Sequence, residues 1–184
     1  MKKIASVLKD DDDYVVLYGT KKNEAFQGSP YPDAINGRGG HDFIAGWGAA
    51  DRLWGGAGND SIYGHSGSDK LYGGPGRDIL SGGKQADVIS GGSGADIFMF
   101  EAWPYDTGGS HLDTIVDFDP GQRGERVALE VATYFEVATF SDLKLYMYES
   151  DGDVVIDFLG RDILVLENLR IDQLSADDFQ IRMI

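Results

Sequence analysis

The sequence predicts an all-β chain, and three observations support this prediction. Aspartate, glycine and a large apolar residue recur together every nine residues through the first half of the chain. Glycine contributes 26 of 184 residues, about twice the usual ~7%, and 20 of these glycines lie between Gly19 and Gly94. In the last third, apolar and polar residues alternate in short runs that are typical of strands.

Composition changes near residue 100, and this change divides the chain. Residues 1–99 carry 13 acids and 10 bases, whereas residues 100–184 carry 18 acids and 6 bases. We therefore expect an N-terminal segment over residues 1–18, a repeat region over residues 19–99 and a β-rich C-terminal region over residues 100–184. Within the repeat, residues 19–36 are degenerate and residues 37–99 are well formed.

The overall composition excludes several classes of protein. A net charge of −15 argues against a nucleic-acid binder or a partner of anionic lipid, because both need a basic surface. The absence of cysteine excludes disulfides, zinc–thiolate sites and cysteine nucleophiles. No apolar run is long enough for a membrane span or a cleaved secretory leader, so we expect a soluble chain whose export does not use an N-terminal signal.

The repeat continues through nine units without a change of phase. Each unit from Gly28 onward opens on glycine, has aspartate at its sixth position and has a large apolar residue at its eighth, as in GGAGNDSIY from Gly55 to Tyr63. A weaker unit with Gly19, Glu24 and Phe26 precedes them. A flexible linker would not keep an apolar residue at the eighth position. The sixth-position residues are Asp33, Asp42, Asp51, Asp60, Asp69, Asp78, Asp87 and Asp96, and the eighth-position residues are Ile35, Ile44, Leu53, Ile62, Leu71, Leu80, Ile89 and Phe98.

Over residues 28–99 this pattern resembles the RTX, or hemolysin-type, calcium-binding nonapeptide GGxGxDxUx. It is similar to the C-terminal regions of type I-secreted proteins such as serralysin-type proteases, and to the repeat modules of mannuronan epimerases. The resemblance implies a right-handed parallel β-roll in which two units make one coil of 18 residues. Each unit contributes a six-residue turn and a three-residue strand, and its eighth residue points into the core.

The same resemblance implies calcium between turns that stack on one edge of the roll. Carboxylate and carbonyl oxygens are the hard ligands that Ca²⁺ prefers. One edge (the Asp42 edge) carries Asp42, Asp60, Asp78 and Asp96 and holds three ions. The other (the Asp33 edge) carries Asp33, Asp51, Asp69 and Asp87 and holds two or three ions, so five or six Ca²⁺ are expected in all.

In each stacked pair, the resemblance assigns the second and fourth carbonyls to the earlier turn and the first and third to the later turn, with an Asp from each. The carbonyl ligands expected on this basis are those of Arg38, Gly40, Trp47, Ala49, Gly55, Gly56, Ala57, Gly58, Gly64, His65, Ser66, Gly67, Gly73, Gly74, Pro75, Gly76, Gly82, Lys84, Gly91 and Ser93.

Departures from the motif weaken particular sites. Ser29 and its neighbours replace the glycines of the first unit, so the ion between Asp33 and Asp51 is doubtful. Ala49 and Gln85 replace fourth-position glycines and must adopt a turn conformation that disfavours side chains. Glu24 lies beside Lys21 and Lys22, and its unit is expected to form a coil that lacks a full ion site.

A single file of core side chains is a small core for so long a repeat, and stacked aspartates repel one another. We therefore hypothesise that the chain stays unfolded at cytosolic calcium, is exported unfolded and folds outside the cell on binding calcium.

The sequence after position 100 predicts several strands and one helical turn. The strands are expected over DTIVDFD (Asp113 to Asp119), Leu143 to Ser150, Asp153 to Phe158, Asp162 to Leu169 and Phe179 to Met183, and the helical turn over Gln173 to Asp178. Asp151-Gly152 and Leu159-Gly160 are the expected hairpin turns.

This C-terminal region resembles the one that closes the roll in RTX proteins, including the ending LSADDF from Leu174 to Phe179. By that resemblance it is a β-sandwich-like cap that carries a type I secretion signal. A cap also protects the open end of a repeat array. Trp103 and Tyr105 are expected to pack at the junction.

No catalytic motif is present. The chain lacks H-E-x-x-H, G-x-S-x-G and a phosphate-binding loop, and His41, His65 and His111 are scattered. Asp10 to Asp13 lack the spacing of an EF-hand and are expected to be solvated. If the chain were an enzyme, the acid–base candidates would be Glu101, Asp106 and Asp113, but we expect no catalytic residues.

Two functions remain open. The first is a secreted, extracellular calcium-binding RTX protein or module without catalysis, whose partners are calcium and a type I secretion machinery. The alternative is a polysaccharide-binding domain of a carbohydrate-active enzyme or adhesin. An acidic polysaccharide would then stack on Tyr63, Tyr72, Trp47 and Trp54.

Overall fold

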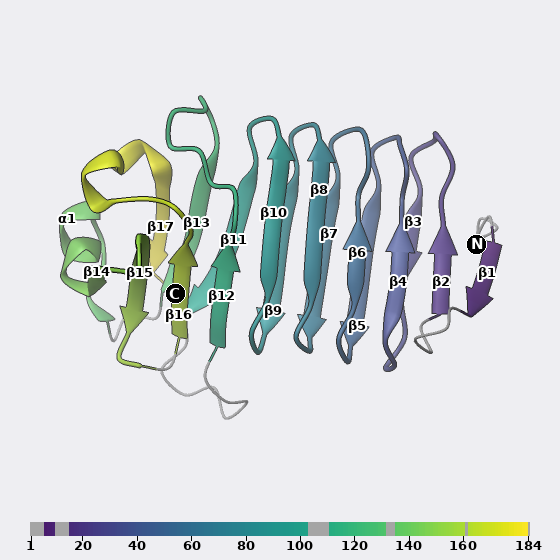
Figure 1. Cartoon of the computed structure of the whole chain (residues 1–184), viewed down its shortest axis with the longest axis horizontal. Coiled ribbons are helices and arrows are strands. Elements are labelled where there is room, and N and C mark those ends of the chain that lie inside the picture. The colour runs from purple at the N-terminus through teal and green to yellow at the C-terminus, as the bar shows by residue number, and fades with distance from the viewer. Residues whose placement is uncertain (1–5, 10–14, 103–110, 132–134, 161, 184) are drawn as a thin grey trace.

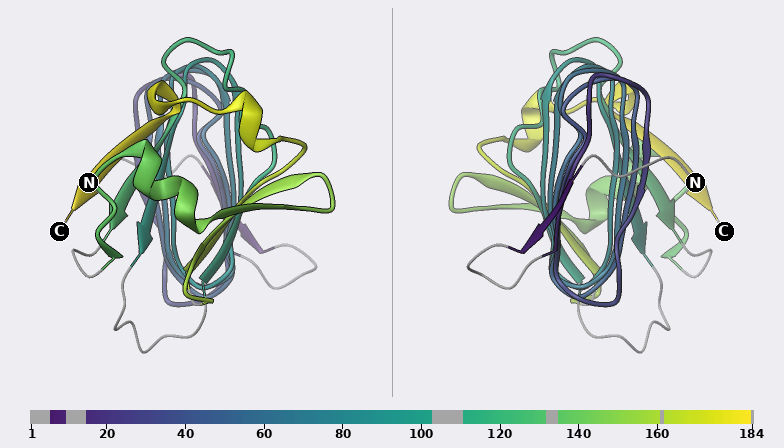
Figure 2. Two further views of the ribbon diagram at one scale, coloured as in Figure 1. Left: turned by 90° about the vertical axis from the view of Figure 1, so that its left-hand side faces the viewer. Right: turned by 90° about the vertical axis from the view of Figure 1, so that its right-hand side faces the viewer.

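Two parallel β-sheets face each other along most of the molecule (Figure 1). The computed structural model describes residues 6–9, 15–102, 111–131, 135–160 and 162–183. Seen along the row of strands, the successive coils superpose as one flattened ring (Figure 2). In spatial order, sheet A contains β1 (Ser6–Lys9), β2 (Val15–Tyr18), β4 (Asp33–Asn36), β6 (Arg52–Trp54), β8 (Lys70–Pro75), β10 (Val88–Ser93), β12 (His111–Ile115), β16 (Asp162–Leu166), β15 (Asp153–Phe158) and β14 (Met147–Ser150). Sheet B contains β17 (Phe179–Met183), β13 (Arg126–Val131), β11 (Ile97–Ala102), β9 (Ile79–Lys84), β7 (Ser61–Ser66), β5 (Phe43–Gly48) and β3 (Ala25–Gln27).

Strands alternate between the two sheets, so one coil takes 18 residues. In sheet A, Ile35 pairs with Leu53 and Leu53 with Leu71. In sheet B, Ile44 pairs with Ile62 in the same way. The predicted β-roll with two units per coil is confirmed. We call the strands β2 to β11 the roll and the elements after them, residues 111–183, the cap.

The core of the roll is a single file of side chains from each sheet. The eighth-position residues from Ile35 to Phe98 are 0–2% exposed. Strand β2, which precedes the expected start of the repeat, pairs in register with β4 and adds Leu17 to this file. Because side chains alternate across a strand, the residues on either side of each core position point outward.

The cap continues both sheets and then closes them. Strands β12 and β16 extend sheet A in parallel, β13 and β17 extend sheet B in parallel, and β15 and β14 pair antiparallel at the end of sheet A. Its core is broader than that of the roll, because the rings of Phe135, Tyr146 and Phe158 pack together with centroids 5.2–6.2 Å apart. The described residues contain no helix that is both long and apolar enough to cross a membrane. The cap also contains helix α1 (Phe140–Leu143) and the 3₁₀ turns η2 (Lys144–Tyr146), η3 (Ile171–Gln173) and η4 (Ala176–Asp178).

Several details of the cap differ from the prediction. The strand expected from Leu143 begins at Met147, because a capping box between Thr139 and Asp142 starts a helix that ends at Leu143. The strand expected through Asp119 ends at Ile115, and β13 had not been predicted.

Other details were right. Asp151 and Gly152 form the predicted hairpin turn, with φ of 56° and 94°. Leu159 and Gly160 lie in the next connection, also with positive φ. Asp10 to Asp13, Trp103, Tyr105 and Asp106 lie outside the described residues.

Candidate metal centre

Two columns of buried aspartates follow the edges of the roll. On each edge, the amide of one Asp donates to Oδ1 of the Asp 18 residues later, as from Asp42 to Asp60 (2.7 Å) and from Asp51 to Asp69 (2.7 Å). All eight sixth-position aspartates are only 1–3% exposed. The nine-residue period therefore places the carboxylates in register between stacked turns.

The second oxygen of most of these carboxylates has no hydrogen-bond partner. The buried Oδ2 atoms without a partner belong to Asp42, Asp51, Asp60, Asp69, Asp78, Asp87 and Asp96. A buried, unpaired anionic oxygen is costly unless a cation or donor satisfies it.

The degenerate units differ from the well-formed ones. Asp33 Oδ2 accepts hydrogen bonds from the amide (2.6 Å) and the hydroxyl (3.0 Å) of Ser29. Glu24 Oε2 accepts one from the amide of Thr20 (2.6 Å). These carboxylates are satisfied by protein groups, which the well-formed units do not supply.

The second- and fourth-position carbonyls of each turn point toward the next turn on the same edge. A Cβ added at Gly56 would strike the carbonyl oxygen of Arg38, and one added at Gly58 would strike that of Gly40. The same relation holds between Gly74 and the oxygen of Gly56. At Gly56, Gly58 and Gly74 a side chain would clash, because the carbonyl of the neighbouring turn occupies its space.

The first- and third-position carbonyls of each turn point toward the preceding turn on the same edge. They therefore enter the same space between two stacked turns as the second- and fourth-position carbonyls of that preceding turn. The oxygen of Gly73 lies 2.8 Å from the position of a Cβ at Gly55. The Ala57 carbonyl accepts a hydrogen bond from the Gly40 amide (2.9 Å), and the Pro75 carbonyl accepts one from the Gly58 amide (2.9 Å). Carbonyls from two stacked turns thus converge beside the aspartate column.

Several side-chain-bearing residues adopt the left-handed conformation that this turn demands. Ala49 and Gln85, which replace fourth-position glycines, have φ of 66° and 79°. The second-position residues Arg38, Trp47 and His65 also have positive φ, between 71° and 83°. Such strain costs about 1–2 kcal/mol per residue, so the turn is maintained at a cost in stability.

Burial raises the pKa of the seven column carboxylates from Asp42 to Asp96. Desolvation is the main cause, and neighbouring aspartates add to it, so that the pKa of Asp51 rises to about 8 and that of Asp78 to about 7. The pKa of Asp87 rises to about 9 through burial and the adjacent Asp113. These sites favour a proton or another cation beside each carboxylate.

The acidic columns extend into the cap, which the sequence reasoning missed. The amide of Asp87 donates to Oδ1 of Asp113 (3.1 Å), 26 residues later, and Glu125 is buried in the strand register that follows Asp96. The signal was the pattern of an acid two residues before a buried apolar residue, as in Asp113-Thr114-Ile115 and Glu125-Arg126-Val127. The nine-residue search did not find this pattern, because Asp113 and Glu125 do not follow the preceding aspartates of their columns at the 18-residue spacing of the roll.

Of the three acid–base candidates, Asp106 lies outside the described residues, and the other two do not form a pair. Asp113 is buried on β12 of sheet A, whereas Glu101 is exposed on β11 of sheet B. The four aromatic candidates are also divided between the sheets. Trp54 and Tyr72 stack on sheet A with centroids 5.6 Å apart, while Tyr63 and Trp47 lie on sheet B beside Phe43 and His65.

The donor set fits a hard cation. Among the described residues, no three acidic or histidine side chains gather into a cluster, so an ion in these turns must draw on backbone carbonyls as well as aspartates. Unpaired carboxylate oxygens and converging carbonyls are the all-oxygen environment that Ca²⁺ prefers. The fold and its edges define a calcium-binding repeat module.

Comparison with known families agrees with this class. Residues 18–51, 48–80 and 72–102 match the RTX calcium-binding nonapeptide repeat. Residues 18–102 therefore contain RTX calcium-binding nonapeptide repeats, and such repeats are typical of secreted proteins. No curated protein sequence matches the chain significantly.

Solved structures that are similar to it include two subunits of an epimerase and a lipase. The solution structure of the AlgE6R2 subunit of the Azotobacter vinelandii mannuronan C5-epimerase is 25% identical, covers 75% of this chain and 91% of its own, with a TM-score of 0.53. The AlgE6R3 subunit of that epimerase is 26% identical, with coverages of 88% and 79% and a TM-score of 0.37. The extracellular lipase LipA of Serratia marcescens is 14% identical, with a TM-score of 0.44; the match covers 91% of this chain but only 40% of the lipase. No catalytic domain is evident in the part of this chain that the structure describes.

Proposed function

We propose that the roll binds five Ca²⁺ ions between stacked turns and folds only when they are bound. The observation that carries this proposal is the set of seven buried Oδ2 atoms without partners, which lie beside carbonyls that converge from two turns. Three ions lie on the Asp42 edge, between Asp42 and Asp60, Asp60 and Asp78, and Asp78 and Asp96. Two lie on the Asp33 edge, between Asp51 and Asp69 and between Asp69 and Asp87. A sixth between Asp33 and Asp51 is disfavoured because Ser29 already satisfies Asp33.

Each ion receives an Asp oxygen from both turns of its pair. The second and fourth carbonyls of the earlier turn and the first and third of the later turn complete six oxygen ligands, within the six to eight that Ca²⁺ takes. For the ion between Asp60 and Asp78, the carbonyls are those of Gly56, Gly58, Gly73 and Pro75, which face one another across this layer. When bound, calcium supplies the positive charge that the desolvated carboxylates lack.

Mass action sets the conditions under which the roll is stable. Extracellular calcium modules bind with dissociation constants of about 10⁻⁴ to 10⁻³ M. When the calcium concentration is ten times the dissociation constant, each site adds about 1.4 kcal/mol to the free energy of unfolding, so five sites add about 7 kcal/mol. This is comparable to the stability of a whole domain. Cytosolic calcium would add almost nothing, so the roll is unfolded inside the cell and folds outside it.

Far-ultraviolet circular dichroism of the full chain tests this proposal. We expect a β-rich spectrum in millimolar calcium, loss of that signal in excess chelator, and recovery when calcium but not magnesium is restored. Magnesium is the control because it demands a smaller, near-octahedral site. An unchanged native spectrum in excess chelator would contradict calcium-dependent folding.

We also propose that the chain is secreted by a type I system that reads its C-terminal residues. The resemblance of LSADDF (Leu174 to Phe179) to the end of RTX proteins supports this route. Deletion of residues 174–184 is expected to abolish export in a reconstituted type I host, whereas an equal deletion within residues 1–11 should leave export intact. Export that survives the C-terminal deletion would rule this route out.

Polysaccharide binding is a second candidate function, and the chain itself contributes no catalysis in either case. The likeness to AlgE6R2, a subunit of an enzyme named for mannuronan, favours this candidate. The outward rings of Trp54 and Tyr72 on sheet A supply a surface on which sugar rings stack.

A further inference from the structure

The outer face of sheet A carries two rows of side chains in strict register. Tyr18, Asn36, Trp54 and Tyr72 form one row, because each pairs with the next across β2, β4, β6 and β8. Val16, Ala34, Arg52 and Lys70 form the row beside it. Neighbouring strands lie about 4.8 Å apart, so both rows run straight across the roll.

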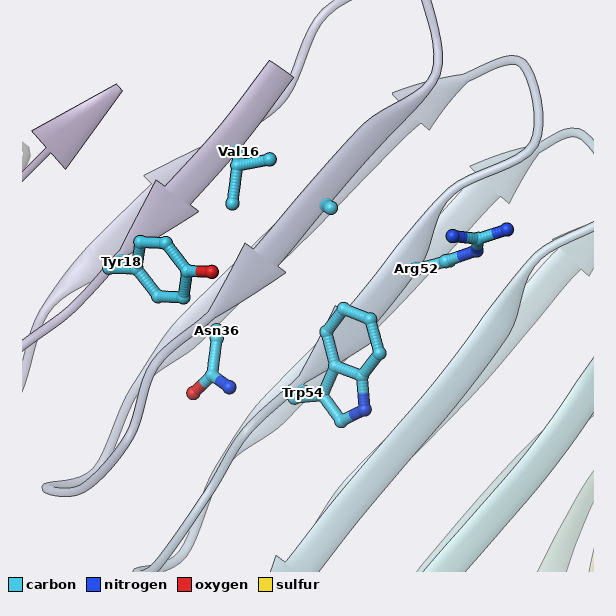
Figure 3. A pocket seen from close by; sticks show the side chains of 6 residues that line it. Val16, Tyr18, Asn36, Arg52 and Trp54 are labelled. Atoms are coloured by element: carbon cyan, nitrogen blue, oxygen red, sulfur yellow. The ribbon is translucent and has the colours of Figure 1, made fainter. Parts of the chain in front are cut away.

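The surface is hollowed where short side chains interrupt these rows. Ala34 and Asn36 lie between larger neighbours, and a cavity of about 230 Å³ opens there. Val16, Tyr18, Arg52 and Trp54 complete its lining. Figure 3 shows the rings of Tyr18 and Trp54 on either side of Asn36, with Arg52 nearby. A shallow hollow of this size suits one ring of an extended chain rather than an enclosed small molecule.

Cations gather on this face although the chain as a whole is acidic. Arg52 and Lys70 are cross-strand neighbours, and the guanidinium of Arg38 lies 5.0 Å from the centre of the Tyr18 ring. The outward residues of β2, β4, β6 and β8 include no carboxylate, because the aspartates of these units are buried. Arg52 and Lys70 therefore bring positive charge to this face.

The opposite face provides an internal comparison. At the corresponding outward positions of β5, β7 and β9, sheet B has Phe43, Ala45, Ser61, Tyr63, Ile79 and Ser81, which include aromatic rings but no cation. Aromatic surface alone would serve a neutral sugar on either sheet. Within the described residues, sheet A alone combines ring faces, an amide and a guanidinium group in one hollow.

We propose that this hollow, together with its neighbours Lys70 and Tyr72 on β8, binds an anionic polysaccharide; we call the surface formed by Tyr18, Asn36, Arg52, Trp54, Lys70 and Tyr72 the sheet A groove. Aromatic faces pack against the sugar rings, Arg52 pairs with a carboxylate or sulfate group, and Asn36 hydrogen-bonds ring hydroxyls. This inference rests on the proposed function, because calcium folds the roll that carries the groove. Five bound ions would also raise the formal net charge from −15 to −5 (−15 + 10), which reduces repulsion of a polyanion.

Calorimetry on the calcium-loaded full chain tests the groove with hexamers of four kinds: a carboxylated saccharide, a sulfated saccharide, a neutral saccharide and an oligouridylate. We expect a carboxylated or sulfated hexamer to bind, with affinity that falls as salt is raised. Which of the two binds more tightly identifies the anionic group. Arg52→Gln and Trp54→Ala should each weaken binding at least tenfold. Tyr63→Ala, an outward aromatic substitution on sheet B, should leave binding unchanged.

Circular dichroism of the same samples separates this inference from the proposed function. A chain that folds with calcium but binds no anionic hexamer would overturn the groove alone. Tighter binding of the neutral hexamer or the oligouridylate, or an equal loss in Tyr63→Ala, would also overturn it. A spectrum that ignores calcium would instead refute calcium-dependent folding, and the hexamer titrations would still decide the groove.

Discussion

Acidic side chains lie in different surroundings in the roll and in the cap. In the roll, the column carboxylates are desolvated and their pKa values are raised, as for Asp51 and Asp78. In the cap, Asp142 is exposed to solvent, and hydrogen bonds from Thr139 and Ala138 lower its pKa. The roll also has a core one side chain deep, whereas the cap packs Phe135, Tyr146 and Phe158 together. Among the described residues, the buried carboxylate oxygens without a hydrogen-bond partner all belong to the roll, and the one buried side-chain atom of the cap without such a partner is Arg126 Nε, so the need for a cation lies in the roll.

A glycine in each region gives the largest expected contrast. Gly58 of the roll has φ of 134° and faces the Gly40 carbonyl, whereas Gly152 of the cap has φ of 94° and open space around it. Gly58→Ala should destabilise the calcium-loaded protein by more than about 4 kcal/mol, the range of severe steric lesions. Gly152→Ala should cost only the backbone strain of about 1–2 kcal/mol. Urea unfolding in calcium measures both, and equal losses would show that the turns do not pack as closely as described.

The effect on stability of removing one column charge should have opposite signs with and without calcium. Asp69→Asn keeps an acceptor for the Asp51 amide but removes a ligand from two proposed sites. At ten times the dissociation constant the loss is about 3 kcal/mol, or two sites of about 1.4 kcal/mol each. In excess chelator the same change should stabilise residual structure, because it removes a desolvated charge. Asp177→Asn, on the exposed surface of the cap, is the control; the account fails if both variants behave alike.

The raised pKa values make the calcium-free roll most stable in acid. Its buried carboxylates bind protons that the unfolded chain has already released, so the free energy of unfolding falls as pH rises from about 4, through the pKa of Asp51 near 8, to that of Asp87 near 9. Saturating calcium should reverse this slope, because the metal binds the ionised carboxylates. The β-content of the calcium-stripped protein, measured by circular dichroism at about pH 5 and pH 8, checks the first slope, and urea unfolding of the calcium-loaded protein at the same two pH values checks the second. Higher stability of the stripped protein at the higher pH would contradict them.

The smallest effect should come from the helix cap. Thr139 Oγ1 accepts a hydrogen bond from the Asp142 amide and donates one to its carboxylate. Thr139→Ala should lower stability by about 1 kcal/mol, by the same amount with and without calcium. A calcium-dependent loss, measured by urea unfolding in both conditions, would mean that the cap and the roll are not separable in this way.

The sequence was sufficient to predict the regular part of the molecule. The nine-residue period determined the coil, the buried face and the alternation of turns between two edges, since a strand of period two follows each glycine turn. It also anticipated the left-handed backbone at Ala49 and Gln85. Where units repeat, one local rule fixes both the position and the surroundings of each aspartate.

The remaining features depend on contacts that spacing does not encode. Asp113 follows Asp87 by 26 residues and Glu125 follows Asp96 by 29, so the continuing columns were missed. Helix α1 replaces the first part of a predicted strand because the Thr139 capping box overrides the alternation that follows. The sheet A groove is formed by residues that are 18 positions apart in the sequence and become neighbours across adjacent strands. Composition does not reveal this arrangement.

A crystal structure of the full chain grown in calcium, with anomalous diffraction to locate the ions, tests the central claim most directly. The account predicts five calcium ions, three on the Asp42 edge and two on the Asp33 edge, each about 2.3–2.6 Å from oxygens of two stacked turns. Turns that hold no ion, with the seven Oδ2 atoms hydrogen-bonded to protein groups instead, would contradict it.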